Sequence, residues 1–238
     1  MKFKILTLFP EMFPGPINHS ITGKALRKKK FQLEAINIRD FSINKAKTVD
    51  DTPFGGGAGM IMKPDILQNA LTFAKKGFKK NCKILSLSPS GKKITQNFIK
   101  NLVSSKEIIL ICGRYEGIDQ RFIDYNEIEE ISVGDYILSG GEIASFILID
   151  ACVRLIPEVL GNNNSLSSES FQDDLLEYSQ YTKPLRWKNM KVPEVLLSGD
   201  HRKILDWRLK NSLEKTKKRR PDLLKLYLDK KRGKWIIY

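Results

Sequence analysis

The sequence predicts an α/β fold in which mainly parallel strands are covered on both faces. Residues 108–112 form a continuous apolar run of strand length, which is typical of a parallel strand buried on two sides. Residues 113–117 follow as a turn with an arginine, a tyrosine and a carboxylate between two glycines, and residues 132–142 repeat this glycine-rich, charged design. Ligands bind at the carboxyl ends of strands in open α/β sheets, so these turns predict a binding site.

The other elements of the predicted first domain are strands and helices in alternation. A strand over residues 3–9 ends at Pro10, and residues 31–38 alternate apolar and polar side chains as a half-exposed strand does. A further strand begins at residue 84, with a turn expected at Gly91. Apolar residues at helical spacing predict the amphipathic helices. Helices are expected over residues 21–30, 65–76, 94–102 and 144–156.

The helix over residues 144–156 is apolar on nearly every side and ends before Pro157. We therefore expect it to be buried in the core or in a subunit interface. Arg154 lies in its last turn. One interpretation is an extended arginine favoured by the helix dipole. The other is a functional cation with a specific partner.

Small polar residues without periodicity mark a linker between two domains. We place an α/β domain at 1–160, the linker at 161–175 and a helical domain at 176–238. In the last of these, Ile204, Leu205, Trp207, Leu209 and Leu213 have helical spacing, and Pro221 and Asp222 begin another helix.

Positive charge is concentrated near the carboxyl end. The 238 residues include 41 Lys or Arg against 27 Asp or Glu, a net charge of +14. Residues 201–238 hold 14 Lys or Arg and 4 Asp or Glu, so most of the excess lies there. This concentration, densest at 217–220, predicts binding to a polyanion such as nucleic acid. The alternative is a solvated helical face, although such faces usually mix both signs.

Several classes of site are disfavoured by the residues. Three widely spaced cysteines, Cys82, Cys112 and Cys152, indicate a reducing compartment and argue against disulfides or a zinc site. Two histidines argue against a histidine-based metal centre. The amino-terminal apolar stretch is too short for a signal sequence or membrane span, which predicts a cytoplasmic protein. The glycines at 55–59 and Gly91 do not have the spacing of a nucleotide-triphosphate loop.

Five motifs in order carry a family resemblance. They are TVDDTPFGGGAGM (48–60), LSPSG (87–91), GRYEGID (113–119), SVGDYILSGGE (132–142) and LLSGDH (196–201). The chain resembles bacterial tRNA (guanine-N(1))-methyltransferases, which methylate the guanine at position 37 of tRNA, next to the anticodon on its 3′ side. The resemblance implies the SPOUT fold, an α/β domain with a deep carboxyl-terminal trefoil knot, followed by a small helical domain.

The resemblance also implies S-adenosylmethionine as methyl donor, and a homodimer with active sites at the subunit interface. It leaves open whether magnesium assists, and it implies no resident metal site. The cofactor-binding residues that it implies are Leu87, Ser88, Pro89, Gly113, Ser132, Val133, Gly134, Asp135, Tyr136, Ile137, Leu138, Gly140 and Gly141.

The chemistry asks for two catalytic groups. Guanine N1 carries a proton and becomes nucleophilic only when a general base removes it. Negative charge then develops on the neighbouring carbonyl oxygen, where a fixed cation stabilises the transition state. The resemblance assigns the cation to Arg154 and the base to position 169, where this chain has Glu169 instead of the family's aspartate. Asp173 and Asp174 are the next candidates for the base.

Four further residues are candidates for contacts with guanine or tRNA. Glu116 and Phe171 are expected to hold the guanine by hydrogen bonding and by stacking. Asp50 either does the same or braces the glycine-rich loop that follows it. His201 is either part of the RNA site or a helix-cap residue.

Two rival functions remain open at this stage. The first is that the chain is a non-catalytic RNA-binding or ribosome-assembly protein, which its basic tail and Glu169 support. Cofactor binding discriminates this case, since a pure binder has no need of the two glycine-rich motifs. The other rival is a SPOUT enzyme that methylates a ribose hydroxyl or another base, and nucleoside analysis of the product discriminates that case.

Overall fold

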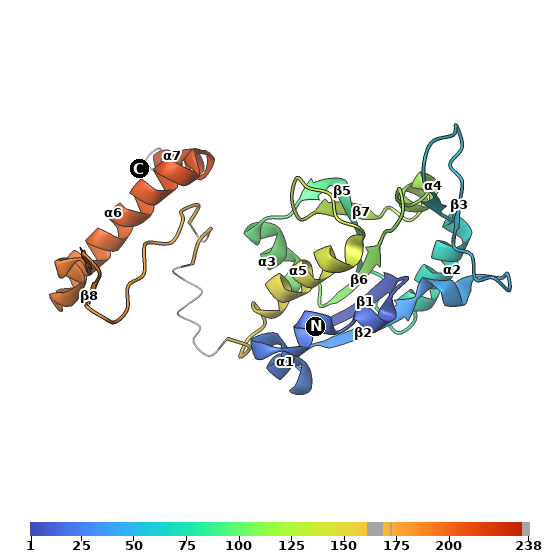
Figure 1. The fold of residues 1–238 in the computed structure, drawn as a ribbon, viewed down its shortest axis with the longest axis horizontal. Helices are drawn as coiled ribbons and strands as arrows, with labels where there is room; N and C mark the ends of the chain where they lie inside the picture. The colour runs from blue at the N-terminus through green and yellow to red at the C-terminus, as the bar shows by residue number, and fades with distance from the viewer. Residues whose placement is uncertain (161–168, 172, 235–238) are drawn as a thin grey trace. The chain divides into compact units, whose positions relative to one another are not determined.

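A computed structural model describes residues 1–160, 169–171 and 173–234 (Figure 1). The chain divides into two compact units, Met1–Gly161 and Asn162–Tyr238, which are described separately. Of the linker predicted at 161–175, residues 161–168 and 172 lie outside the described residues.

The first unit is built on a parallel sheet, as predicted. Among the described residues the sheet has five strands, and each neighbouring pair is parallel. The strand order is β2 (Gln32–Asn37), β1 (Lys2–Thr7), β6 (Glu107–Cys112), β5 (Lys83–Lys93) and β7 (Glu129–Ser132).

Helices cover both faces of this sheet. On β6, Ile108 and Leu110 pack against α1 (Ser20–Arg27), α3 (Gln96–Val103) and α5 (Gly141–Val153). Ile109 and Ile111 face the opposite layer, formed by α2 (Pro64–Lys75) and α4 (Gln120–Tyr125). Figure 1 shows α5 on one side of the sheet and α2 on the other. The expectation that this strand is buried on two faces is confirmed, because all four isoleucines and leucines are fully buried.

Short elements complete the unit and hold its loops in place. They are η1 (Pro10–Met12), η2 (Gly15–Asn18), η3 (Ile38–Phe41), β3 (Asp50–Asp51) and β4 (Ile61–Met62). The last two pair with each other in antiparallel fashion.

The prediction that a turn at Gly91 ends this strand is wrong, because β5 continues to Lys93. Leu87 and Lys92 both align with Ile131 of β7, so residues 88–91 form a bulge and the pairing then resumes. A Cβ on Gly91 would lie 2.4 Å from the Ile131 backbone nitrogen. Only a glycine allows this close return of the chain, which aims the bulge at the carboxyl end of the sheet.

Helix α5 begins at Gly141, three residues earlier than predicted. Most of its side chains are buried, while Ile143 and Ile147 are 47% and 42% exposed.

The short helix α4 was not predicted. The Asp119 side chain caps its start by accepting a hydrogen bond from the Arg121 N–H. Its six residues carry too short an apolar pattern to be distinguished from a loop.

The second unit contains the hairpin β8 (Arg186–Trp187) and β9 (Met190–Lys191), η5 (Glu194–Leu197), α6 (His201–Arg219) and α7 (Pro221–Lys234). Both long helices were predicted, and the hairpin was not. Asp200 caps α6 by accepting a hydrogen bond from the Lys203 N–H at 3.1 Å. In the described part of the chain, no helix is both long and apolar enough to cross a membrane.

Candidate active site

A cavity of about 340 Å³ lies at the carboxyl end of the sheet in the first unit. Its walls come from the β5 bulge, from the turn after β6 and from the segment between β7 and α5. The β5 bulge begins after Leu87, which aligns with Cys112 at the end of β6, so all three segments lie at the same edge of the sheet. The two glycine-rich, charged turns singled out in the sequence therefore meet around one cavity.

The cavity brings together nearly all the residues that the family resemblance associates with the cofactor. Asp135 is the exception, since it does not line the cavity and pairs with Lys93 at 3.0 Å. The predicted residues that do line it are Leu87, Ser88, Pro89, Gly113, Ser132, Val133, Gly134, Tyr136, Ile137, Leu138, Gly140 and Gly141.

The lining combines apolar and polar surface and carries more negative than positive charge. Among the residues that line the cavity, the acids are Glu116 and Glu130 and the cation is Arg114. Arg114 is itself bound to a carboxylate outside the lining, Glu142. A triphosphate needs several cations or free backbone N–H groups around it. The charge of the cavity instead favours a partly apolar ligand that is neutral or positively charged near the two carboxylates.

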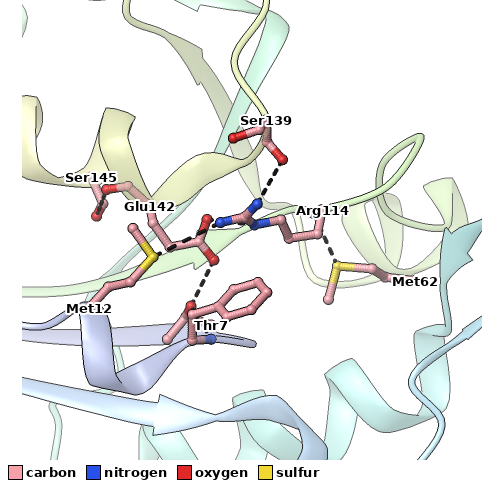
Figure 2. Close-up of polar contacts among 8 residues, drawn as sticks. Thr7, Met12, Met62, Arg114, Ser139, Glu142 and Ser145 are labelled. Atoms are coloured by element: carbon pink, nitrogen blue, oxygen red, sulfur yellow. Dashed lines mark hydrogen bonds and ion pairs between the residues drawn. The ribbon is translucent and has the colours of Figure 1, made fainter.

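The Arg114 guanidinium, in the turn after β6, binds residues of the segment that follows β7 (Figure 2). Its Nε donates to Glu142 Oε2 at 2.9 Å, and Nη1 donates to the Ser139 carbonyl at 3.0 Å. Thr7 Oγ1 donates to the other Glu142 oxygen at 2.8 Å. The Phe9 ring lies beneath the guanidinium, with 4.5 Å from the ring centroid to Cζ.

This arrangement fixes the segment after β7 against the turn after β6. The Glu142 side chain is fully buried, while that of Arg114 is 20% exposed. A Cβ on Gly140 would lie 2.2 Å from Arg114 Nε, so a side chain there would displace the guanidinium. Sequence reasoning did not find this ion pair. Arg114 and Glu142 lie in different motifs, and nothing in either motif indicates that the two side chains meet.

The turn containing Glu116 is braced by the hairpin that begins with Asp50. The Glu116 N–H donates to the Met60 carbonyl at 2.9 Å, and the Met62 N–H donates to the Gly117 carbonyl at 3.0 Å. Asp50 pairs with Met62 across β3 and β4. Asp50 thus lies in the hairpin that contacts the turn, and the exposed Glu116 lines the cavity. Tyr115 adopts a φ of +60°, a left-handed backbone angle that is uncommon for residues with a side chain.

The remaining candidates belong to two different units. Arg154 follows the last turn of α5 in the first unit, where its N–H donates to the Asp150 carbonyl at 3.1 Å. Glu169, Phe171 and His201 belong to the second unit. The Phe171 ring is 45% exposed, and the Arg220 guanidinium lies 6.0 Å from its centroid. His201 is the first residue of α6 and is exposed.

The cysteines are unsuited to nucleophilic chemistry. All three are free. Burial raises the pKa of the Cys152 thiol to about 12, and burial together with nearby Glu142 raises the pKa of Cys112 well above its usual range. Both thiols are therefore protonated at neutral pH, whereas the thiolate is the nucleophile. Among the described residues, no three His, Cys, Asp or Glu side chains lie close enough together to hold a metal ion.

Basic side chains dominate the surface of the second unit's helices. Lys217, Lys218 and Arg219 are exposed at the end of α6. Arg220 pairs with Asp222 at 2.6 Å, and Lys230 pairs with Asp174. The acids therefore neutralise part of the charge around this run, while no described acid pairs with residues 217–219.

Known proteins of one family match this chain along almost its entire length. Residues 1–226 match the family model described as tRNA (Guanine-1)-methyltransferase TrmD. A tRNA (guanine-N(1)-)-methyltransferase of Wolbachia pipientis subsp. Culex pipiens is 52% identical over 222 residues, covering 92% of this chain and 95% of its own. The protein of that name from Pelagibacter ubique is 52% identical over 224 residues, covering 94% and 97%. The one from Neorickettsia sennetsu is 51% identical over 224 residues, covering 94% and 98%. The chain belongs to the tRNA (guanine-1)-methyltransferase family.

Proposed function

We propose that the protein transfers a methyl group from S-adenosylmethionine to N1 of guanosine 37 in tRNA. The observation that carries the proposal is the family match over residues 1–226. The cavity between the two glycine-rich motifs supports it, because it lies where α/β proteins bind their ligands. The direct test is methyl transfer to a tRNA transcript, followed by nucleoside analysis.

The cavity suits S-adenosylmethionine in size and in chemistry. Its volume of about 340 Å³ is within the usual range for a small-molecule site. Leu87, Ile131 and Leu138 offer apolar surface for an adenine ring. Glu116 and Glu130 provide negative charge for a ligand that bears a sulfonium. When bound there, the cofactor supplies an activated methyl group together with its own leaving group.

Glu169 acts as the general base in this proposal. Its carboxylate accepts the proton from guanine N1, and the freed nitrogen lone pair forms the bond to the methyl carbon while the carbon–sulfur bond breaks. Such a base contributes about 10²–10⁴-fold to the rate. Arg154 stabilises the negative charge that develops on the guanine carbonyl oxygen. Glu116, Asp50 and Phe171 hold the flipped guanine, and His201 contacts the RNA at the start of α6.

The second unit holds the tRNA through its phosphates. We expect the triple variant Lys217→Ala/Lys218→Ala/Arg219→Ala to reduce the slope of log binding constant against log salt by about 2–3, since each lost phosphate contact removes about 0.7–0.9. Filter binding of tRNA between 50 and 300 mM salt measures this slope.

A matched control removes the same charge elsewhere. Lys79, Lys80 and Lys83 are exposed near the start of β5, at the end of the sheet opposite the cavity. Their triple alanine variant is expected to leave the slope within about 0.5 of wild type. Equal slopes for the two triple variants would contradict a phosphate-binding role for the basic run.

The proposed assembly is a homodimer with each active site completed by both chains. Ile143 and Ile147 lie four residues apart on one face of α5 and are partly exposed, which supports burial of this face by a second copy. We expect a mass of two chains in sedimentation equilibrium, and a shift to one chain for Ile147→Lys. A wild-type protein that stays at the mass of one chain at tens of micromolar would contradict this assembly.

We also propose the trefoil knot and the domain limits implied by the family. The chain leaves β7 at the sheet edge and returns past β5 to the end of β6, where the Gly141 N–H donates to the Gly113 carbonyl at 3.0 Å. A Cβ on Gly141 would lie 2.7 Å from the Cys112 Cα. This tight return supports a knotted path. A circular permutant opened within residues 133–140 is expected to lose cofactor binding, and full binding by that permutant would contradict the knot's role.

A further inference from the structure

A short hairpin in the second unit carries an arrangement that the proposed chemistry does not use. Trp187 pairs with Met190 across the two strands, and Arg186 pairs with Lys191. Residues directly opposite one another project from the same face of a two-stranded ribbon. One face therefore presents an indole and a thioether, and the other presents two cations.

The whole hairpin is open to solvent. Every residue from 180 to 191 is exposed, and the Trp187 and Met190 side chains are 56% and 59% exposed. Leu185, just before the hairpin, is 58% exposed. Single exposed apolar residues are ordinary, but three large ones on one small ribbon form a patch of the kind that marks an interaction site.

The charges of the hairpin are all of one sign. Arg186 and Lys191 are directly opposite each other, which disfavours the hairpin by repulsion. Lys188 lies over the Trp187 ring, with its nitrogen 4.8 Å from the centroid. Among the described residues of this unit, the ion pairs involve Lys203, Arg220 and Lys230, and none involves a hairpin cation. An anionic partner would relieve this repulsion.

The hairpin is nevertheless held by a firm scaffold. The Val192 N–H donates to the Leu185 carbonyl at 3.2 Å and closes its base. Upstream, the Ser179 N–H donates to Asn211 Oδ1 of α6 at 2.8 Å. The Tyr181 ring packs against Trp207 of α6, with centroids 6.2 Å apart. These contacts close the base of the hairpin and tie the segment before it to α6, which lowers the entropic cost of ordering the hairpin on binding.

We propose that the hairpin is an RNA-binding site in which Trp187 stacks on an unpaired nucleobase, while Arg186, Lys188 and Lys191 contact phosphates. Aromatic side chains beside cations are the usual means of binding single-stranded nucleic acid, because every nucleotide has a flat base that can stack and a phosphate that attracts a cation. The inference rests on the proposed function to the extent that the RNA is the substrate tRNA. The stacked base is a second nucleotide, distinct from the guanine that receives the methyl group.

The test compares tRNA binding by wild type, Trp187→Ala and Trp187→Phe in filter-binding titrations at fixed salt. Stacking of one base predicts about tenfold weaker binding for Trp187→Ala. Trp187→Phe keeps an aromatic ring and is expected to bind within about twofold of wild type. Leu197→Ala is a matched control, because Leu197 is exposed in the same unit but lies in η5, outside the hairpin.

Salt dependence separates stacking from charge. Lys191→Ala is expected to reduce the salt slope by about one, whereas Trp187→Ala leaves the slope unchanged. Trp187→Ala binding as tightly as wild type would overturn the proposal, as would equal weakening by Trp187→Phe. A surface that binds a protein partner would give the first of these results.

Failure of the hairpin proposal and failure of the methyltransferase proposal would give different results. A wild-type protein that methylates tRNA, with Trp187→Ala binding normally, would leave the enzyme standing and remove the hairpin site. A wild-type protein that binds tRNA without methylating it, with Trp187→Ala binding about tenfold more weakly, would support the hairpin site and contradict the enzyme.

Discussion

Replacing Glu169 by glutamine is expected to lower the single-turnover rate of methyl transfer by about 10²–10⁴-fold. Glutamine keeps the size and hydrogen-bonding capacity of the side chain but accepts no proton from guanine N1. Binding of tRNA and of S-adenosylmethionine is therefore expected to stay within about twofold of wild type. Rapid-quench measurements with preformed complexes separate the chemical step from binding.

Asp173→Asn is the matched control for this experiment. Asp173 is an exposed carboxylate four residues away in the same unit, and it has no chemical role in the proposed mechanism. The control is expected to react at the wild-type rate. If Glu169→Gln reacts at full speed while Asp173→Asn or Asp174→Asn is inactive, the base has been misassigned. Glu169→Asp restores the family's residue and is expected to retain activity.

Replacing Arg114 by methionine is expected to lower the free energy of unfolding by about 3–5 kcal/mol, because it leaves the carboxylate of Glu142 buried without its cation. Glu142 is fully buried, and Thr7 would be its remaining side-chain partner among the described residues. Urea denaturation followed by far-ultraviolet circular dichroism measures the change.

Two further variants decide whether the effect comes from an unpaired buried charge. Arg121 pairs with Asp119 at 2.7 Å, but its side chain is 73% exposed and water screens the pair, so Arg121→Met is expected to leave the denaturation midpoint close to that of wild type. The double variant Arg114→Met/Glu142→Leu removes both charges and is expected to recover most of the lost stability. A denaturation midpoint for Arg114→Met equal to that of wild type would refute the structural role of the pair.

The parts of the fold that sequence patterns predicted are those governed by local periodicity. Residues 108–112 had to be a strand covered on both faces because they contain no polar side chain. The apolar residues at helical spacing that predict the helix over residues 65–76 include Ile66, Leu67 and Leu71, and all three are buried in α2. The two charged glycine turns indicated a site, and they do border the same cavity.

The parts that patterns did not predict depend on contacts between distant residues. Arg114 and Glu142 are far apart in the sequence, and a carboxylate after two glycines gives no sign of burial. The continuation of β5 beyond the bulge depends on the close approach of Gly91 to Ile131. The detailed set of residues predicted to bind the cofactor came from the family resemblance, since spacing alone indicated only a ligand site.

In the second unit, helical spacing predicted α6 but not its packed face. Leu205 and Leu209 are 61% and 45% exposed, while Thr216 is fully buried. Thr216 Oγ1 accepts from the Leu176 N–H at 2.8 Å and donates to the Ser212 carbonyl at 2.7 Å. Polar contacts with the preceding segment thus determine which side of this helix is covered, and the spacing of apolar residues does not predict such contacts.

The most direct test of the account is methyl transfer from labelled S-adenosylmethionine to an unmodified tRNA transcript with guanosine at position 37, followed by nucleoside analysis. We expect 1-methylguanosine at that position, and no product from a transcript with adenosine there. Binding of tRNA without methyl transfer would contradict the account in favour of a non-catalytic RNA-binding protein. Label in a ribose or in another base would contradict it in favour of a different methyltransferase.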